Sequence, residues 1–138
     1  MSFLLLFYFC YDIIFVVITV KIQCFDYLPD CAKQIRQAVF IDEQGFKSEY
    51  DDIDALAIHL VLFDGNTAKA TCRVFESGEK NVYILGRLAV LKQFRGSGLG
   101  SKILAAAQEY VKSVGGRAIK LHSQCAAKEF YERAGYTA

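Results

Sequence analysis

The chain has 138 residues, of which 16 are Lys or Arg and 15 are Asp or Glu, and its formal net charge is +1. This length is typical of one domain that buries a core without disulfides or metal, and the balanced charge excludes a basic nucleic-acid footprint. The five cysteines, an odd number without Cys-x-x-Cys spacing, indicate reduced thiols in a cytoplasmic protein.

The N-terminal residues 3–20 form an apolar run that only Asp12 interrupts. Its length is near the lower limit of a membrane helix, about 17 residues, and no basic segment precedes it as in a signal peptide. Three interpretations stay open: residues 1–18 are an extension or a wrongly assigned start, they anchor the chain in a membrane, or they fold onto the domain. The end of the run, residues 18–25, alternates as a first strand would.

A helix is expected to begin at Asp30, which follows Pro29 and is the predicted N-cap, and to end at Gly45. Its buried face is predicted to carry Ile35, Ala38 and Val39. The acidic segment that follows, residues 49–54, lacks the spacing of a calcium-binding loop. Two interpretations of this segment stay open: a solvated loop, or a region that attracts a cationic amine toward a site.

The next two apolar segments, residues 57–63 and 68–75, flank Asp64-Gly65-Asn66 and predict a β-hairpin. His59 lies in the first of these strands and is expected to have a structural role rather than a catalytic one.

The central stretch of the chain reads as a strand, a glycine-rich loop and a helix. The strand spans residues 82–90, and Gly86 within it indicates a bulge or a close backbone approach. The loop Arg95-Gly-Ser-Gly-Leu-Gly100 leads into a helix whose apolar positions are Ile103, Leu104, Ala107, Tyr110 and Val111. Three glycines at the positive end of a helix leave N–H groups open to a phosphate or pyrophosphate. A strand at 117–121 and a helix at 126–133, ended by Gly135, are expected beyond it.

Two phosphate-binding motifs are excluded by spacing. A P-loop needs Lys directly after the last glycine, but Gly100 is followed by Ser101. The dinucleotide fingerprint needs a further glycine where this chain has Ser101 or Ile103, and an acidic residue after the next strand, where it has His122.

The remaining motif, Arg-x-x-Gly-x-Gly at Arg95, Gly98 and Gly100, resembles the acyl-CoA loop of the GCN5-related N-acetyltransferase (GNAT) family. Residues 121–136 are similar to the family's strand, helix and Phe-Tyr-Glu closing motif. Residues 35–46 look like the first-helix signature of a bacterial subgroup of small, uncharacterised acetyltransferases. Together the three motifs cover roughly residues 20–138.

The resemblance implies an α/β, three-layer GNAT fold with a mixed, mostly antiparallel sheet and helices on both faces. It implies a GNAT domain over residues 19–138 that lacks the family's last two strands after the closing helix, with residues 1–18 as an extension. In the family a bulge in the central strand separates two parallel strands, and the acyl-CoA arm lies in the opening.

The implied activity is transfer of an acetyl group from the cosubstrate acetyl-CoA, without metal, to a small amine. Tyr131 stands at the Phe-Tyr-Glu position and is the expected acid for the departing thiolate, because a phenol stays protonated at pH 7. The alternative is that Tyr131 only packs against the central helix. The base is left open between Glu43, His122 and a water relay.

The expected carrier site combines the glycine-rich loop with the strand before it. Main-chain N–H groups from Gly96 to Ser101 are expected to hold the pyrophosphate, and Arg95 to add charge. The resemblance implies that the pantetheine arm pairs with the main chain of residues 88–90, and that the N–H of Val90 or a neighbour polarises the thioester. The predicted carrier-binding residues are Leu88, Ala89, Val90, Arg95, Gly96, Ser97, Gly98, Leu99, Gly100, Ser101 and Gln124.

Two further expectations concern single residues of this region. Gly98 is expected to be glycine because the pyrophosphate approaches its backbone, so that valine there would abolish CoA binding with little effect on stability. Cys125 is expected to pack rather than react.

Other classes of function stay open. The missing strands favour a non-catalytic acyl-CoA-binding module or an inactive fragment as alternatives to an enzyme. The expected partner is a small-molecule amine and not nucleic acid; membrane contact is expected only through residues 3–20, and a homodimer is left open.

Overall fold

The computed structural model describes residues 2–9, 12–122 and 127–137, with side chains from residue 20 onward. Within these ranges one sheet has the strand order β1-β2-β3-β4-β5-β6. Its strands are β1 (Ser2–Phe9), β2 (Asp12–Phe25), β3 (Ile58–Asp64), β4 (Thr67–Glu76), β5 (Val82–Val90) and β6 (Ala118–Leu121). All neighbours pair antiparallel except β5 and β6, which pair parallel. The predicted mixed, mostly antiparallel sheet is confirmed.

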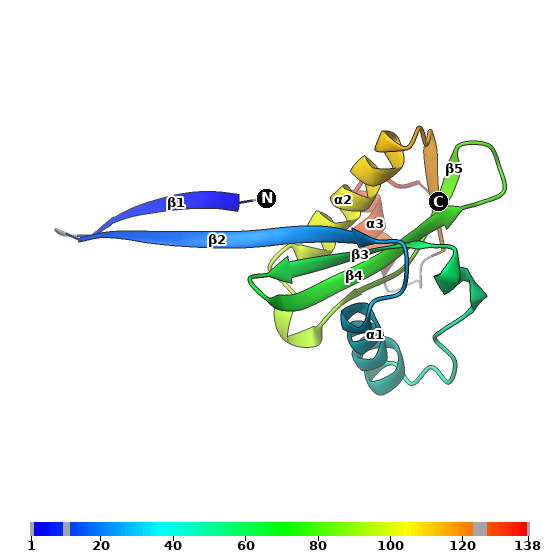
Figure 1. The fold of residues 1–138 in the computed structure, drawn as a ribbon, viewed down its shortest axis with the longest axis horizontal. Coiled ribbons are helices and arrows are strands. Elements are labelled where there is room, and N and C mark those ends of the chain that lie inside the picture. The colour runs from blue at the N-terminus through cyan, green and yellow to red at the C-terminus, as the bar shows by residue number, and fades with distance from the viewer. Residues whose placement is uncertain (1, 10–11, 123–126, 138) are drawn as a thin grey trace.

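Helices cover both faces of this sheet, as predicted (Figure 1). The helices are α1 (Asp30–Arg36), α2 (Leu99–Ser113) and α3 (Lys128–Arg133). A hydrophobic cluster lies on each face of the sheet, one packed with α1 and the other with α2. Because side chains alternate between the faces along a strand, Val61 of β3 lies in the cluster with α1, whereas Leu60 and Leu62 lie in the cluster with α2. Each of these side chains is almost fully buried, which contributes about 1.5–3 kcal/mol per side chain relative to exposure.

The first helix differs in two respects from the prediction. Pro29, and not Asp30, occupies the N-cap position, so Asp30 is the first helical residue. After Arg36 the helix continues as a π-helical segment, η1 (Gln37–Glu43). Ile35 and Val39 are buried, as predicted, whereas Ala38 is only half-buried because the wider π-helical turn changes the spacing of the buried face.

The N-terminal residues form a hairpin in which β1 pairs with β2 from Ser2 opposite Thr19 to Phe9 opposite Asp12. In β2, only Val20 to Phe25 also pair with β3, which confirms the strand predicted at residues 18–25. The rest of the hairpin extends beyond the other elements (Figure 1). No helix in the described ranges is long and apolar enough to cross a membrane.

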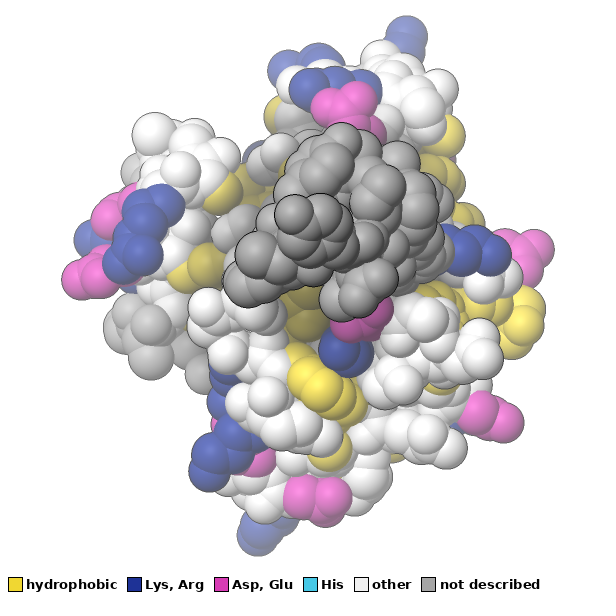
Figure 2. All heavy atoms as spheres, turned by 90° about the vertical axis from the view of Figure 1, so that its left-hand side faces the viewer, with side chains coloured by type: hydrophobic (Ala, Val, Ile, Leu, Met, Phe, Trp, Pro, Cys, Tyr) yellow, Lys and Arg dark blue, Asp and Glu magenta, His cyan; other side chains and the backbone are white. Residues whose placement is uncertain are grey.

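The face of the molecule from which this hairpin extends carries both positive and negative charge. On the described part of this face, acidic and basic side chains are interspersed and hydrophobic side chains lie in small groups (Figure 2).

The hairpin predicted around Gly65 is confirmed as β3 and β4, with Gly65 in the left-handed conformation at φ +59°.

Candidate active site

A bulge in β5 shapes the centre of the sheet. The register with β4 shifts after the pair Arg73–Gly86, so that Arg87 and Leu88 together lie opposite Cys72. Arg87 has a φ of +54°, a left-handed conformation that costs a non-glycine residue about 1–2 kcal/mol. The predicted bulge is therefore present, but the residue in the strained conformation is Arg87, whereas Gly86 keeps a regular pairing.

The parallel strands β5 and β6 separate beyond the bulge. They pair only as far as Leu85 opposite Leu121, and β5 then continues to Val90 paired with β4 but not with β6. Since the N–H of Leu91 donates to Lys69 O of the β4 side (3.0 Å), strand alternation directs the main-chain groups of Leu88 and Val90 away from β4. These groups border the opening that the sequence predicted.

Ala89 does not share this orientation. Its main chain faces β4, and its side chain is buried in the cluster that contains α1. This geometry contradicts the prediction that Ala89 pairs with a carrier, because the preceding strand already occupies that side of β5.

The glycine-rich loop lies at the N-terminus of α2, as the motif predicted. Gly98 is the N-cap, with φ +82°, and the first turn carries no acidic residue. Among the described residues, no acceptor contacts the N–H groups of Leu99, Gly100 and Ser101. Added Cβ atoms at Gly96 or Gly98 would meet nothing within 4 Å. The helix therefore presents free donors and its positive end to an open surface, a geometry suited to pyrophosphate.

Arg95 is already engaged in this structure. Its Nη1 and Nη2 donate to the two carboxylate oxygens of Glu43 (2.7 and 3.1 Å), and its Nε donates to Val90 O (2.9 Å). A guanidinium has five N–H donors, so two remain for a ligand. Hydrogen bonding from Arg95 lowers the pKa of Glu43, which makes Glu43 a weak base.

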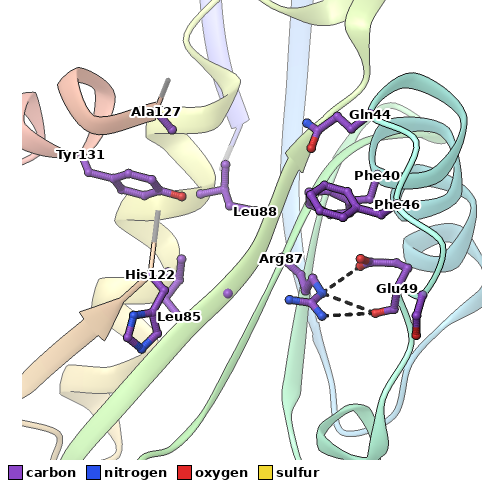
Figure 3. Close-up of a pocket in the computed structure, with 12 residues that line it drawn as sticks. Phe40, Gln44, Phe46, Glu49, Leu85, Arg87, Leu88, His122, Ala127 and Tyr131 are labelled. Carbon is purple, nitrogen blue, oxygen red and sulfur yellow. Dashed lines mark hydrogen bonds and ion pairs between the residues drawn. The ribbon is translucent and has the colours of Figure 1, made fainter. Parts of the chain in front are cut away.

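A cleft of about 260 Å³ lies across the bulge, between the end of the first helix and the last one (Figure 3). Its described lining comprises Phe40, Gln44, Phe46, Ser48, Glu49, Leu85, Gly86, Arg87, Leu88, His122, Ala127 and Tyr131. Glu43 is not among them, whereas the exposed His122 is. Gln124 and Cys125 lie outside the described residues.

Tyr131 has its ring in the core and its hydroxyl in the cleft, on the side where Leu88 lies (Figure 3). The ring packs edge-on against Phe130 and Tyr136, at centroid distances of 5.0 and 6.0 Å. No described residue hydrogen-bonds its hydroxyl. Burial raises the pKa of Tyr131 above 10, so the phenol holds its proton throughout the neutral range. The packing role and a proton-donor role are therefore compatible.

The structure corrects the interpretation of residues 49–54 as a solvated loop. Glu49 and Asp54 are buried and pair with arginines from three different elements. Arg36 of α1 contacts Glu49 and Asp54, each at 2.7 Å. Arg73 of β4 contacts Asp51 and Asp54 (2.6 and 2.7 Å), and Arg87 of β5 contacts Glu49 (3.0 Å). Three guanidinium groups balance the three carboxylates of Glu49, Asp51 and Asp54, so this network is not a solvated face.

The sequence contains a signal for this network. Arg36 continues the buried spacing of Ala32, Ile35 and Val39, and a charged residue at such a position is rarely buried without a partner. His59, beside the network, is 1% exposed and donates from Nε2 to Asp54 O (2.9 Å), consistent with its expected structural role.

Comparisons with known proteins agree with this geometry. A sequence model of the acetyltransferase (GNAT) family matches residues 23–136. A Bacillus subtilis (strain 168) protein, provisionally named an acetyltransferase, is 39% identical over 110 residues, which cover 76% of this chain and 74% of that protein. A provisionally named N-acetyltransferase from Lactobacillus plantarum has a TM-score of 0.78 at 31% identity, over 86% of this chain and 84% of that one. An acyl-CoA N-acyltransferase from Pseudomonas aeruginosa shares the fold, with a TM-score of 0.77 at 22% identity, over 87% of this chain and 90% of that one.

Proposed function

Because the chain belongs to the GNAT acetyltransferase family, we propose that it transfers an acetyl group from acetyl-CoA to the nitrogen of a small amine. The observation that carries this proposal is the opening between β5 and β6, which lies next to the uncapped N-terminus of α2. An extended carrier arm and its pyrophosphate need these two features side by side.

The carrier is proposed to bind through main-chain groups. The free N–H groups at Leu99, Gly100 and Ser101 would hold the pyrophosphate, and the remaining donors of Arg95 would add charge-assisted hydrogen bonds. The arm would lie along β5 and pair with Leu88 and Val90, whose polar groups face the opening. The N–H of Leu88 or Val90 would donate to the thioester oxygen, where negative charge develops during transfer.

The transfer itself needs one bond formed and one broken. The ammonium of the bound amine first gives a proton to solvent water. The neutral nitrogen then attacks the thioester carbon, the new C–N bond replaces the C–S bond, and the leaving thiolate takes a proton from the hydroxyl of Tyr131. The nitrogen releases its extra proton to solvent water, which reaches the cleft beside the exposed His122, and the phenolate of Tyr131 takes a proton back from that water. Proton donation by a positioned acid typically contributes about a hundredfold or more to the rate.

Two measurements test this function. Calorimetry with acetyl-CoA should show binding to the full chain, and release of free CoA thiol should depend on an added amine. Binding without thiol release for any amine in a broad panel would indicate a non-catalytic acyl-CoA-binding module. Absence of binding would reject the carrier site as well.

A further inference from the structure

The wall of the cleft opposite Tyr131 combines an aromatic pair with an ion pair. Phe40 and Phe46 pack edge-on, with ring centroids 6.5 Å apart, and Phe46 is 44% exposed. Beside them, Glu49 and Arg87 line the same cleft (Figure 3). A ligand that has an apolar part and a short polar group can therefore contact the aromatic pair and the ion pair together.

Arg87 keeps a donor group free for a ligand. Its Nε lies 3.0 Å from Glu49 Oε1, and its Nη2 lies 3.5 Å from Asp51 Oδ2. No described residue accepts a hydrogen bond from Nη1, which points away from Glu49 toward β5 (Figure 3). The Arg87 side chain is 33% exposed, so a ligand oxygen can reach these N–H groups.

Glu49 offers the complementary atom. The shortest contacts that Glu49 makes with Arg36 and Arg87 both involve Oε1, and no described residue donates a hydrogen bond to Oε2. The cleft thus presents a guanidinium nitrogen on one side of the Arg87 fork and, on the other side, the edge of the Glu49 carboxylate, whose side chain is 4% exposed.

The charge of the surrounding network restricts what can bind there. Because the three arginines and the three carboxylates already balance, a ligand with a net charge would leave that charge unmatched in a poorly solvated wall. A zwitterion adds no net charge, and its ammonium and carboxylate match Glu49 and Arg87. A diamine or a phosphorylated amine lacks this match.

We propose that the acceptor is an α-amino acid with an aromatic or large apolar side chain. Its carboxylate binds Nη1 of Arg87, its amino group lies at Oε2 of Glu49, and its side chain packs on Phe40 and Phe46. Glu49 and Arg87 line the same cleft as Leu88, whose main-chain N–H is one of the donors assigned to the thioester. This inference rests on the proposed function only for the identity of the reaction, and not for binding.

Binding to the full chain in the presence of CoA gives the first test. L-phenylalanine is compared by calorimetry with phenethylamine, which lacks the carboxylate, and with 1,5-diaminopentane, which has a second amine instead. We expect L-phenylalanine to bind at least about tenfold more tightly than either amine, the effect of one charge-assisted hydrogen bond. Equal or tighter binding of either amine overturns the proposal.

Thiol release with the same three compounds separates this inference from the proposed function. If L-phenylalanine binds selectively but no compound releases thiol, the proposed function fails and the amino-acid site stands. If thiol is released fastest with the diamine, acetyl transfer stands and the amino-acid site fails.

Two variants test the assigned residues. Arg87→Lys keeps a cation near Glu49 but removes the guanidinium fork, and should lower the affinity ratio of L-phenylalanine to phenethylamine about tenfold. Phe46→Ser, on an exposed ring, should lower the affinity ratio of L-phenylalanine to glycine by several fold. Arg133→Lys, at an exposed site on α3, is the matched control and should change neither ratio. Unchanged ratios in both Arg87→Lys and Phe46→Ser overturn the assignment, and melting temperatures verify that each variant is folded.

Discussion

Arg95 and Glu43, 52 residues apart in the sequence, form a bidentate ion pair with N–O distances of 2.7 and 3.1 Å. The pair connects the end of the first helical segment to the loop before α2. The third contact of Arg95, from Nε to Val90 O, fixes the same side chain to the end of β5. Arg95 therefore fixes the position of the glycine-rich loop in addition to carrying charge.

Substituting each partner of this pair in turn separates the two roles of Arg95, which are to carry charge and to hold the loop. Arg95→Ala should weaken CoA binding about tenfold, since one charge-assisted hydrogen bond contributes about 1.5 kcal/mol. Glu43→Gln leaves Arg95 with an uncompensated charge and should leave CoA affinity unchanged or higher. Calorimetric titration of both variants provides the comparison. If Glu43→Gln weakens binding as much as Arg95→Ala does, Arg95 acts only by holding the loop.

The backbone conformation of Gly98 favours glycine at this position independently of any ligand. Its φ of +82° is strained for any side chain, so Gly98→Val should lower the melting temperature by several degrees, because the left-handed conformation costs about 1–2 kcal/mol. This corrects the expectation of nearly unchanged stability. The same variant should also lose CoA binding, because its Cβ enters the open loop surface.

Gly65→Val is the matched control for this experiment. Gly65 also has a positive φ, +59°, and open space around it, but it lies in the turn between β3 and β4. It should lose comparable stability and retain CoA affinity. Retention of CoA affinity by Gly98→Val would reject the loop as a pyrophosphate site.

The sequence predicted those features that depend on local pattern. The strand at residues 82–90 has the predicted bounds, since a continuous apolar run between turn signals is a local property. The bulge was predicted at Gly86, the permissive residue, but Arg87 adopts the strained conformation. Its contacts with Glu49, 38 residues away, accompany that conformation, and no local pattern contains such a pairing.

The sequence also could not predict which main-chain groups of β5 face β4 and which face the opening. A bulge shifts which residues face each neighbour, so whether Ala89 faces β4 or the opening depends on the register with β4. The arginine network was missed for a similar reason, because Arg36 and Asp54 are 18 residues apart and Arg73 and Asp51 are 22 apart.

Burial of His59 predicts a pH-dependent stability. Burial lowers the pKa of His59 below 6.5, whereas the unfolded chain titrates near 6.5. Below that pH the unfolded state binds more protons, so stability is complete above pH 6.5 and is lost as the pH falls toward the folded pKa, by at most about 1.4 kcal/mol per pH unit. Urea unfolding at pH 7.5, 6.5 and 5.5 measures this slope.

His59→Gln should reduce the slope, because an amide can still donate to Asp54 O but does not titrate. His122→Gln, which changes the exposed histidine, is the control and should retain it. Burial opposes the charged form of Asp54, but hydrogen bonds from Arg36 and Arg73 outweigh it and lower the pKa of Asp54 to about 2. The stability that depends on this carboxylate is therefore lost only below about pH 4, outside the pH range in which His59 is tested. An unchanged slope in His59→Gln would assign the titration to another group.

The phenol of Tyr131 is the remaining test of the mechanism. Tyr131→Phe removes one oxygen and keeps the ring that packs against Phe130 and Tyr136, so folding and CoA affinity should be preserved. The turnover number should fall about a hundredfold, the usual contribution of a positioned acid. Because burial raises the pKa of Tyr131 above 10, activity of the parent should decline only as the pH rises through that elevated value, and the variant should lack this decline. Tyr136→Phe is the matched control: its hydroxyl accepts a hydrogen bond from Gln108 Nε2 (3.3 Å) outside the cleft, so turnover should persist. Equal turnover of Tyr131→Phe and the parent protein would mean that Tyr131 only packs and that solvent supplies the proton.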